Sequence, residues 1–106
     1  MANSENEFIV EDEFDRMLRT ATNDMIKERG LADTVRLSEI APQIDSDHYV
    51  VGLKQKTGRS RSSYYSFYVD PAEALTAVGG GYVTVDAVKG LVRREMMKIF
   101  PDSATH

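Results

Sequence analysis

Apolar residues recur at intervals of three and four positions between Glu11 and Arg29. This spacing places an apolar stripe along one side of an α-helix. Acidic residues in the first turn and basic residues in the last complement the helix dipole, and Gly30 follows where a left-handed C-terminal cap is expected. The pattern predicts a helix of about five turns, whose apolar side carries Phe14, Met17, Leu18, Ala21 and Met25.

A second stretch with helical spacing lies between Ser38 and Ile44. Ser38 is a favourable N-cap, and Pro42 falls early enough in the segment to be tolerated. The segment is therefore predicted to be a short helix with one apolar face, formed by Leu37, Ile40, Ala41 and Ile44.

Apolar and polar residues alternate after Tyr49 and again after Tyr64, which is the period of β-strands. The intervening residues 56–59 contain a glycine and form a turn region, so the two strands are predicted to make a β-hairpin. A hairpin alone is only marginally stable, and its apolar face is expected to pack on the helices. That face carries Val51, Leu53, Tyr65 and Phe67.

Two more helices are predicted after the hairpin. Asp70 and Pro71 are typical of a helix start, and the glycines at 79–81 end this short helix. Thr84 caps the last helix, whose apolar side is formed by Val88, Leu91, Val92, Met96 and Ile99. Gly90 lies within this helix, and we expect another backbone to approach closely there.

The predicted order is a long N-terminal helix, a short helix, a β-hairpin, a short helix and a C-terminal helix, which indicates a small α+β domain. A chain of 106 residues with 42% hydrophobic and 28% charged residues is typical of one soluble globular domain. We assign the domain to residues 11–101, with an acidic flexible N-terminal tail at 1–10 and a C-terminal tail at 102–106.

The sequence contains no cysteine, which excludes disulfides and thiol catalysis. Its longest apolar runs have three residues, whereas a membrane-spanning helix needs about 20. The acidic N-terminus differs from a signal or transit peptide. We therefore expect an intracellular protein, cytoplasmic or nuclear, that does not cross a membrane.

The net charge of -4 conceals an uneven distribution, because residues 1–15 sum to -6 and residues 48–69 sum to +4. Cations that neutralise phosphates, together with aromatic rings that stack on unpaired bases, are typical of nucleic-acid binders. The hairpin is therefore a candidate nucleic-acid site of a small regulatory domain. Its candidate residues are Lys54, Lys56, Arg59, Arg61, Tyr64 and Tyr68.

Two further hypotheses concern these charges. The exposed side of the last helix, with Lys89, Arg93 and Arg94, is a second candidate for contacting nucleic acid. The acidic N-terminal segment would compete with nucleic acid if it paired with the basic hairpin of the same molecule.

A protein-interaction module, an adaptor or a small inhibitor, is the alternative function. The acidic N-terminus would dock on a basic partner, and the hairpin would supply aromatic anchors. Methionines on both long helices also suit an adaptable surface such as that of a homodimer: Met17, Met25, Met96 and Met97.

Three stretches of the chain resemble parts of the small helical adaptor shared by the SAGA coactivator and the nuclear mRNA-export machinery. They are residues 25–31, residues 37–42 and residues 85–89. That family is all helical, so the hairpin and the glycine run would be an insertion between the matching pieces. The resemblance implies an adaptor role.

Catalysis is not expected, because the chain has no cysteine and two histidines. Asp45, Asp47 and His48 form the one cluster with metal-ligand chemistry, and a metal-assisted enzyme is the weakest alternative. The sequence favours a non-enzymatic binding domain without a cofactor.

Overall fold

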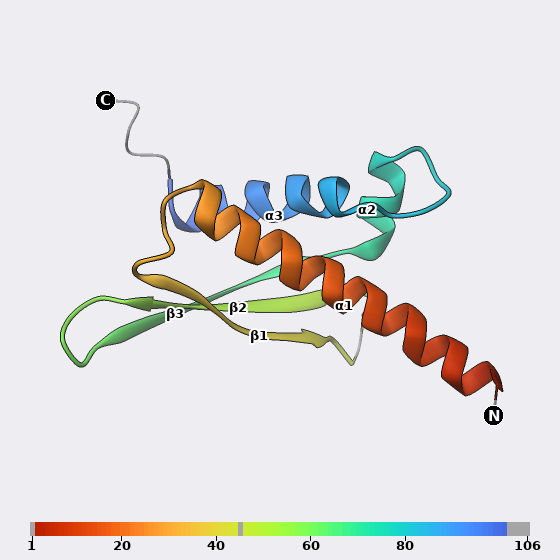
Figure 1. Cartoon of the computed structure of the whole chain (residues 1–106), viewed down its shortest axis with the longest axis horizontal. Coiled ribbons are helices and arrows are strands. Elements are labelled where there is room, and N and C mark those ends of the chain that lie inside the picture. The colour runs from red at the N-terminus through yellow and green to blue at the C-terminus, as the bar shows by residue number, and fades with distance from the viewer. Residues whose placement is uncertain (1, 45, 102–106) are drawn as a thin grey trace.

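The computed structural model describes the backbone of residues 2–44 and 46–101 and the side chains of residues 13–44 and 46–101. None of the helices in these ranges is both long and apolar enough to span a bilayer. The fold is a small α+β domain, as the sequence predicts (Figure 1). Its elements are α1 (Ala2–Glu28), β1 (Val35–Pro42), β2 (Tyr49–Lys56), β3 (Ser62–Val69), α2 (Pro71–Ala77) and α3 (Val85–Ile99).

The three strands form one antiparallel sheet in the order β1-β2-β3. β2 and β3 pair continuously from Tyr49 opposite Val69 to Lys56 opposite Ser62, which confirms the predicted hairpin. α1 and α3 lie side by side on one face of this sheet (Figure 1). The opposite face, here called the outer face, is covered by no helix of the described chain.

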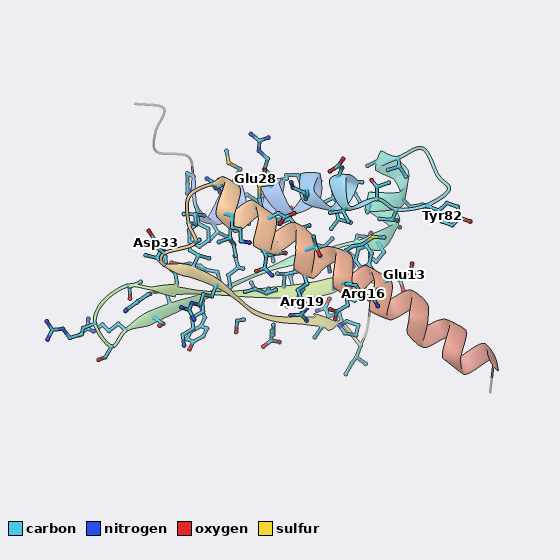
Figure 2. The ribbon with its side chains drawn as sticks, viewed as in Figure 1. Glu13, Arg16, Arg19, Glu28, Asp33 and Tyr82 are labelled. Atoms are coloured by element: carbon cyan, nitrogen blue, oxygen red, sulfur yellow. The ribbon has the colours of Figure 1, made fainter. Side chains whose placement is uncertain are left out.

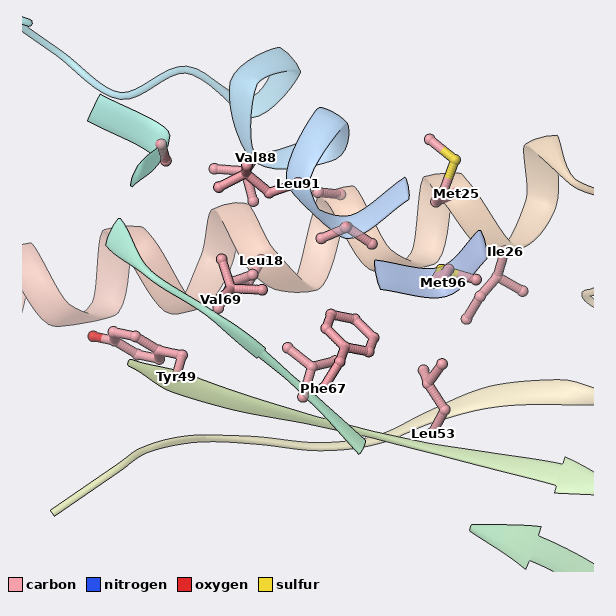
Figure 3. Close-up of a cluster of buried hydrophobic side chains, with 14 of the residues drawn as sticks. Leu18, Met25, Ile26, Tyr49, Leu53, Phe67, Val69, Val88, Leu91 and Met96 are labelled. Carbon is pink, nitrogen blue, oxygen red and sulfur yellow. The ribbon is translucent and has the colours of Figure 1, made fainter. Parts of the chain in front are cut away.

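The predicted apolar sides of the helices and the hairpin meet in one core between the sheet and the helices (Figure 3). The ring of Phe14 packs against that of Tyr49, with centroids 4.9 Å apart. Burial of each large apolar side chain stabilises the fold by about 1.5–3 kcal/mol. The other buried apolar residues are Leu18, Ala21, Met25, Ile26, Val35, Val51, Leu53, Phe67, Val69, Ala74, Val88, Leu91, Val92 and Met96.

The prediction of a short helix at Ser38–Ile44 is wrong, because most of this segment belongs to strand β1. The pairing of β1 with β2 shifts by one residue between Leu37 and Glu39, which is a β-bulge. As a result Leu37 and Ile40 face the same side of the sheet although they are three positions apart. Three is also a helical spacing, and this coincidence explains the error.

Helix α1 starts at Ala2 rather than at the predicted Glu11, so residues 2–10 continue the helix where a flexible tail was expected. Its C-terminal end is as predicted. Gly30 has a φ of +70°, and its N–H donates to the carbonyl of Lys27 at 3.0 Å. The N–H of Leu31 donates to the carbonyl of Ile26 at 2.9 Å, which completes a Schellman cap. The predicted tail at 102–106 lies outside the described residues.

The predicted caps of α2 and α3 are confirmed. The Asp70 carboxylate accepts a hydrogen bond from the N–H of Ala72 at 2.9 Å, and the Thr84 hydroxyl accepts one from Ala87 at 3.2 Å. The close backbone approach expected at Gly90 is wrong, because an added Cβ would meet no atom beyond the helix backbone within 4 Å.

The molecule is elongated, with extents of 49 × 31 × 22 Å. The N-terminal end of α1 and the turn between β2 and β3 lie at opposite ends of it (Figure 1). The N-terminal end of α1 and the cation-bearing part of the hairpin, residues 54–61, therefore lie toward opposite ends of the molecule. The hypothesis that the acidic segment covers the basic hairpin of the same molecule is not supported by this arrangement.

Candidate nucleic-acid interface

A mixed row of cations and an aromatic ring crosses the outer face of the sheet. Lys54 on β2 is the direct cross-strand neighbour of Arg36 on β1 and of Tyr64 on β3. All three side chains are exposed. The row arises because outward residues alternate with the buried residues of each strand.

Beside this row, at the hairpin end of the molecule, the surface forms an open hollow of about 410 Å³. It is lined by the loop before β1, by β1 itself and by the β2–β3 hairpin. Asp33, labelled in Figure 2, is the one carboxylate among the lining residues. Five cations line the hollow: Arg36, Lys54, Lys56, Arg59 and Arg61.

The hairpin turn holds two of these cations at the end of the sheet. The N–H of Thr57 donates to the carbonyl of Arg61 at 3.0 Å and closes the turn. Arg59 lies inside the closed turn, and both arginines are exposed. The turn therefore adds its positive charge to the row on the strands.

The five cations of this hollow outnumber its one lining carboxylate, that of Asp33. Among the described side chains, none of the five forms an ion pair. Two of the α3 cations that were predicted to contact nucleic acid do form ion pairs. Lys89 pairs with Glu28, and Arg94 pairs with Glu73 at 2.6 Å and Glu95 at 3.0 Å. These contacts raise the pKa values of Lys89 and Arg94, and the Arg94 guanidinium lowers the pKa of Glu73.

The ring of Tyr64 is the exposed aromatic surface next to the basic hollow. It is 67% exposed, and the Lys54 ammonium nitrogen lies over it at 5.8 Å from the ring centroid. This cation–π contact orients both side chains on the outer face. A stacking surface and a positive charge therefore occupy the same row.

Tyr68 is on the same face but outside this cluster. Four residues along β3 place it about 13 Å from Tyr64. Its ring is 52% exposed and meets the ring of His48 edge-on, with centroids 6.5 Å apart. The His48 Nε2 atom lies 3.9 Å from the Asp70 carboxylate. Tyr68 also lines a hollow with both acidic and basic residues, among them Glu73 and Arg94, so its surroundings are mixed in charge.

Five of the six predicted site residues therefore gather at one end of the sheet, and Tyr68 stands apart. Arg36 is the cation that sequence reasoning missed, because no strand was predicted before the hairpin and most of β1 was assigned to a short helix. The alternation of Val35, Arg36 and Leu37 was a short strand signal in the sequence. Placing that strand beside the hairpin would have brought Arg36 next to Lys54.

The candidate metal cluster is only partly within the described chain, because Asp45 lies outside it. Among residues 13–44 and 46–101, no group of three histidine or acidic side chains is placed to hold a metal ion. His48 instead contacts Asp70 and Tyr68.

The sheet distinguishes this chain from the all-helical adaptor family that short stretches of its sequence resemble. No protein-family model, curated protein or solved structure matches the chain.

Proposed function

We propose that the basic end of the outer face binds single-stranded nucleic acid. The cations of the hollow contact phosphates, and Tyr64 stacks on a base. The observation that carries this proposal is a set of five cations around one open hollow, none of which forms an ion pair with a described side chain. The adjoining row on the strands also presents an exposed aromatic ring. Contacts between cations and phosphates give such a site its affinity. Stacking on an aromatic ring tolerates any base, so the site can bind many sequences.

The shape of the site favours single strands over duplex. An exposed ring on an open sheet can stack only on a base that is not already stacked within a duplex. A helix that reads the major groove of a duplex needs side chains that are free to reach base edges. Lys89 and Arg94 on α3 are held by carboxylates instead.

The overall negative charge is compatible with this function. The acidic segment 1–15 begins at the far end of the molecule from the hairpin turn (Figure 1). Charges farther apart than the Debye length, about 8–10 Å at physiological ionic strength, are largely screened. The hollow therefore presents a local positive field to a polyanion.

Fluorescence anisotropy with a labelled single-stranded oligonucleotide tests the proposal. The double variant Arg59→Ala, Arg61→Ala removes two positive charges from the hollow. The matched control Arg16→Ala, Lys27→Ala also removes two exposed positive charges, but from α1. We expect the first pair to weaken binding at least tenfold and the control to change it less than twofold.

Three outcomes would contradict the proposal. Equal losses in the two double variants would mean that net charge, not the hollow, determines binding. Tighter binding to a duplex of the same sequence would contradict the single-strand specificity. No binding to either form at low salt would reject the nucleic-acid function itself.

A further inference from the structure

An apolar groove of about 530 Å³ lies away from the basic hollow, between α1, the start of β2, α2 and the loop before α3. Figure 2 shows two of its residues, Glu13 and Tyr82, at the end of the molecule opposite Asp33. Glu13 is the one charged residue that lines it. The apolar lining includes Phe14, Met17, Tyr49, Pro71, Leu75 and Tyr82.

Two large apolar side chains of this groove are left outside the core. Tyr82 is 91% exposed and Leu75 is 36% exposed. Tyr82 follows Gly79, Gly80 and Gly81, whose φ angles are +77°, +93° and +89°. Apart from its neighbours in the chain, no described residue places an atom within 4 Å of a Cβ added to any of these glycines, so this rim of the groove is loosely packed. Tyr82 can therefore move toward an occupant without breaking core contacts.

The charge beside the groove indicates what kind of occupant fits. Glu13 lines the groove, and residues 1–15 carry six acidic residues without a basic one. Most of this segment is the N-terminal part of α1, which continues past the groove. We propose that the groove binds an amphipathic helix of a partner protein, with apolar residues in the groove and Lys or Arg facing the acidic part of α1. This proposal is independent of nucleic-acid binding.

A helix fits the groove better than an extended strand. Strand addition needs an unpaired sheet edge, and the strand residue in this groove, Tyr49, belongs to the central strand β2. A helix instead presents apolar anchors at three-and-four spacing to a groove between helices. Opposite charges at its border would speed association and select basic partners.

A second copy of this chain is a poorer occupant. A twofold dimer through the groove would bring the same surface of both copies together, and with it two acidic segments of charge -6. The apolar faces of α3 and of residues 13–28 of α1 are already buried in their own core, as Val88 and Leu18 show. Neither of these two helical segments is therefore free to enter the groove of another copy.

The test uses the full chain and a labelled synthetic helical peptide of leucine and lysine, with the leucines at three-and-four spacing. A leucine–glutamate peptide of the same pattern and a serine–lysine peptide are the ligand controls. We expect the leucine–lysine peptide to bind, and Tyr82→Ala and Glu13→Lys each to weaken binding at least about fivefold. The matched control Ile44→Ala, an apolar residue 98% exposed outside the groove, should change binding less than twofold.

Several results would overturn the proposal. Equal binding of the leucine–glutamate peptide would remove the selection for a basic partner, and equal binding of the serine–lysine peptide would remove the role of the apolar groove. An unchanged affinity in Tyr82→Ala would place the peptide elsewhere. Absence of binding, or a dimer in sedimentation experiments that Tyr82→Ala abolishes, would also reject it. The variant Arg59→Ala, Arg61→Ala should bind the peptide normally, which separates this test from the nucleic-acid proposal.

Discussion

Lys54 and Tyr64 are direct cross-strand neighbours on the outer face, and the ammonium nitrogen lies over the ring at 5.8 Å from its centroid. This pair joins the two kinds of group that a single strand requires: a cation for phosphate and a ring for a base. The pair also lies in the row that borders the basic hollow. The proposed function depends on this arrangement more than on any single residue.

The first prediction separates stacking from charge. Tyr64→Ala should weaken binding of a single-stranded oligonucleotide by about 1–3 kcal/mol, because one base loses its stacking surface. The dependence of affinity on salt should stay as in the wild type, because no cation is removed. Anisotropy titrations at several salt concentrations measure both quantities. Tyr64→Phe keeps the ring and should bind nearly as the wild type does.

Tyr68→Ala serves as the position control for the same experiment. Tyr68 lies about 13 Å from Tyr64 along the strand. The substitution should have little effect on a short oligonucleotide held at the hollow and a larger effect on one long enough to reach it. If Tyr68→Ala and Tyr64→Ala weaken a short oligonucleotide equally, the site is not centred on the hollow.

The second prediction concerns a buried hydroxyl group. Thr22 is fully buried on α1, and its Oγ1 atom has no hydrogen-bond partner among the described residues. Replacing an unpaired buried hydroxyl with a methyl group removes a desolvation cost, so Thr22→Val should stabilise the protein by about 1 kcal/mol. Urea unfolding measures the change in the free energy of unfolding.

Thr76→Val is the matched control, because the Thr76 hydroxyl is exposed and donates to the carbonyl of Ala72 at 2.9 Å. It should bring no gain in stability. A clear loss of stability in Thr22→Val would mean that the Thr22 hydroxyl is hydrogen-bonded in solution.

The third prediction contrasts two glycines. Gly30 caps α1 with a φ of +70°, a conformation that costs alanine about 1–2 kcal/mol. Gly90 lies in the interior of α3 with open space around the position of a Cβ. Gly30→Ala should therefore destabilise the protein, and Gly90→Ala should stabilise it by about 0.8–1.0 kcal/mol through helix propensity. The same sign for both substitutions in thermal unfolding would contradict the assigned backbone conformations.

The fourth prediction concerns pH. The Arg94 guanidinium lowers the pKa of Glu73 below its usual value of 4.5. Because the folded-state pKa is the lower one, the pair stabilises the fold above the unfolded-state pKa, and this contribution is lost as the pH falls through the folded-state pKa. Both side chains are nearly half exposed, so the contribution is below about 1 kcal/mol.

The comparison of wild type with Glu73→Gln in urea unfolding measures this contribution. At neutral pH the variant should be slightly less stable, and below the folded-state pKa the two proteins should unfold alike. A difference in stability that is the same at both pH values would mean that the charge on Glu73 does not stabilise the fold.

Much of the fold could be predicted because its signals are local. Gly30, Asp70 and Thr84 mark helix ends within a few residues, and the alternation after Tyr49 and Tyr64 predicts the hairpin without reference to distant segments. Strand β1 could not be recognised in the same way. Its bulge changes the spacing of apolar residues, and pairing with β2 depends on a contact far along the chain.

The residues of the candidate site also divide into those that local sequence reveals and those that only contacts between distant segments bring together. The hairpin cations were found because they are close in sequence, whereas Arg36 joins them only through the pairing of β1 with β2. Tyr68 was grouped with them because the alternation of side chains along a strand puts Tyr64 and Tyr68 on the same face. This alternation does not say how far apart on that face two residues lie. The groove around Tyr82 could not be predicted, because it is assembled from four separate segments.

The salt dependence of binding tests the central claim most directly. If the five cations of the hollow contact phosphates of a single strand, the logarithm of the binding constant should fall with the logarithm of salt concentration with a slope of about -3.5. Arg59→Ala, Arg61→Ala should reduce the slope to about -2.1. A slope near zero in the wild type, or an unchanged slope in the double variant, would contradict the assignment of the hollow as a nucleic-acid site.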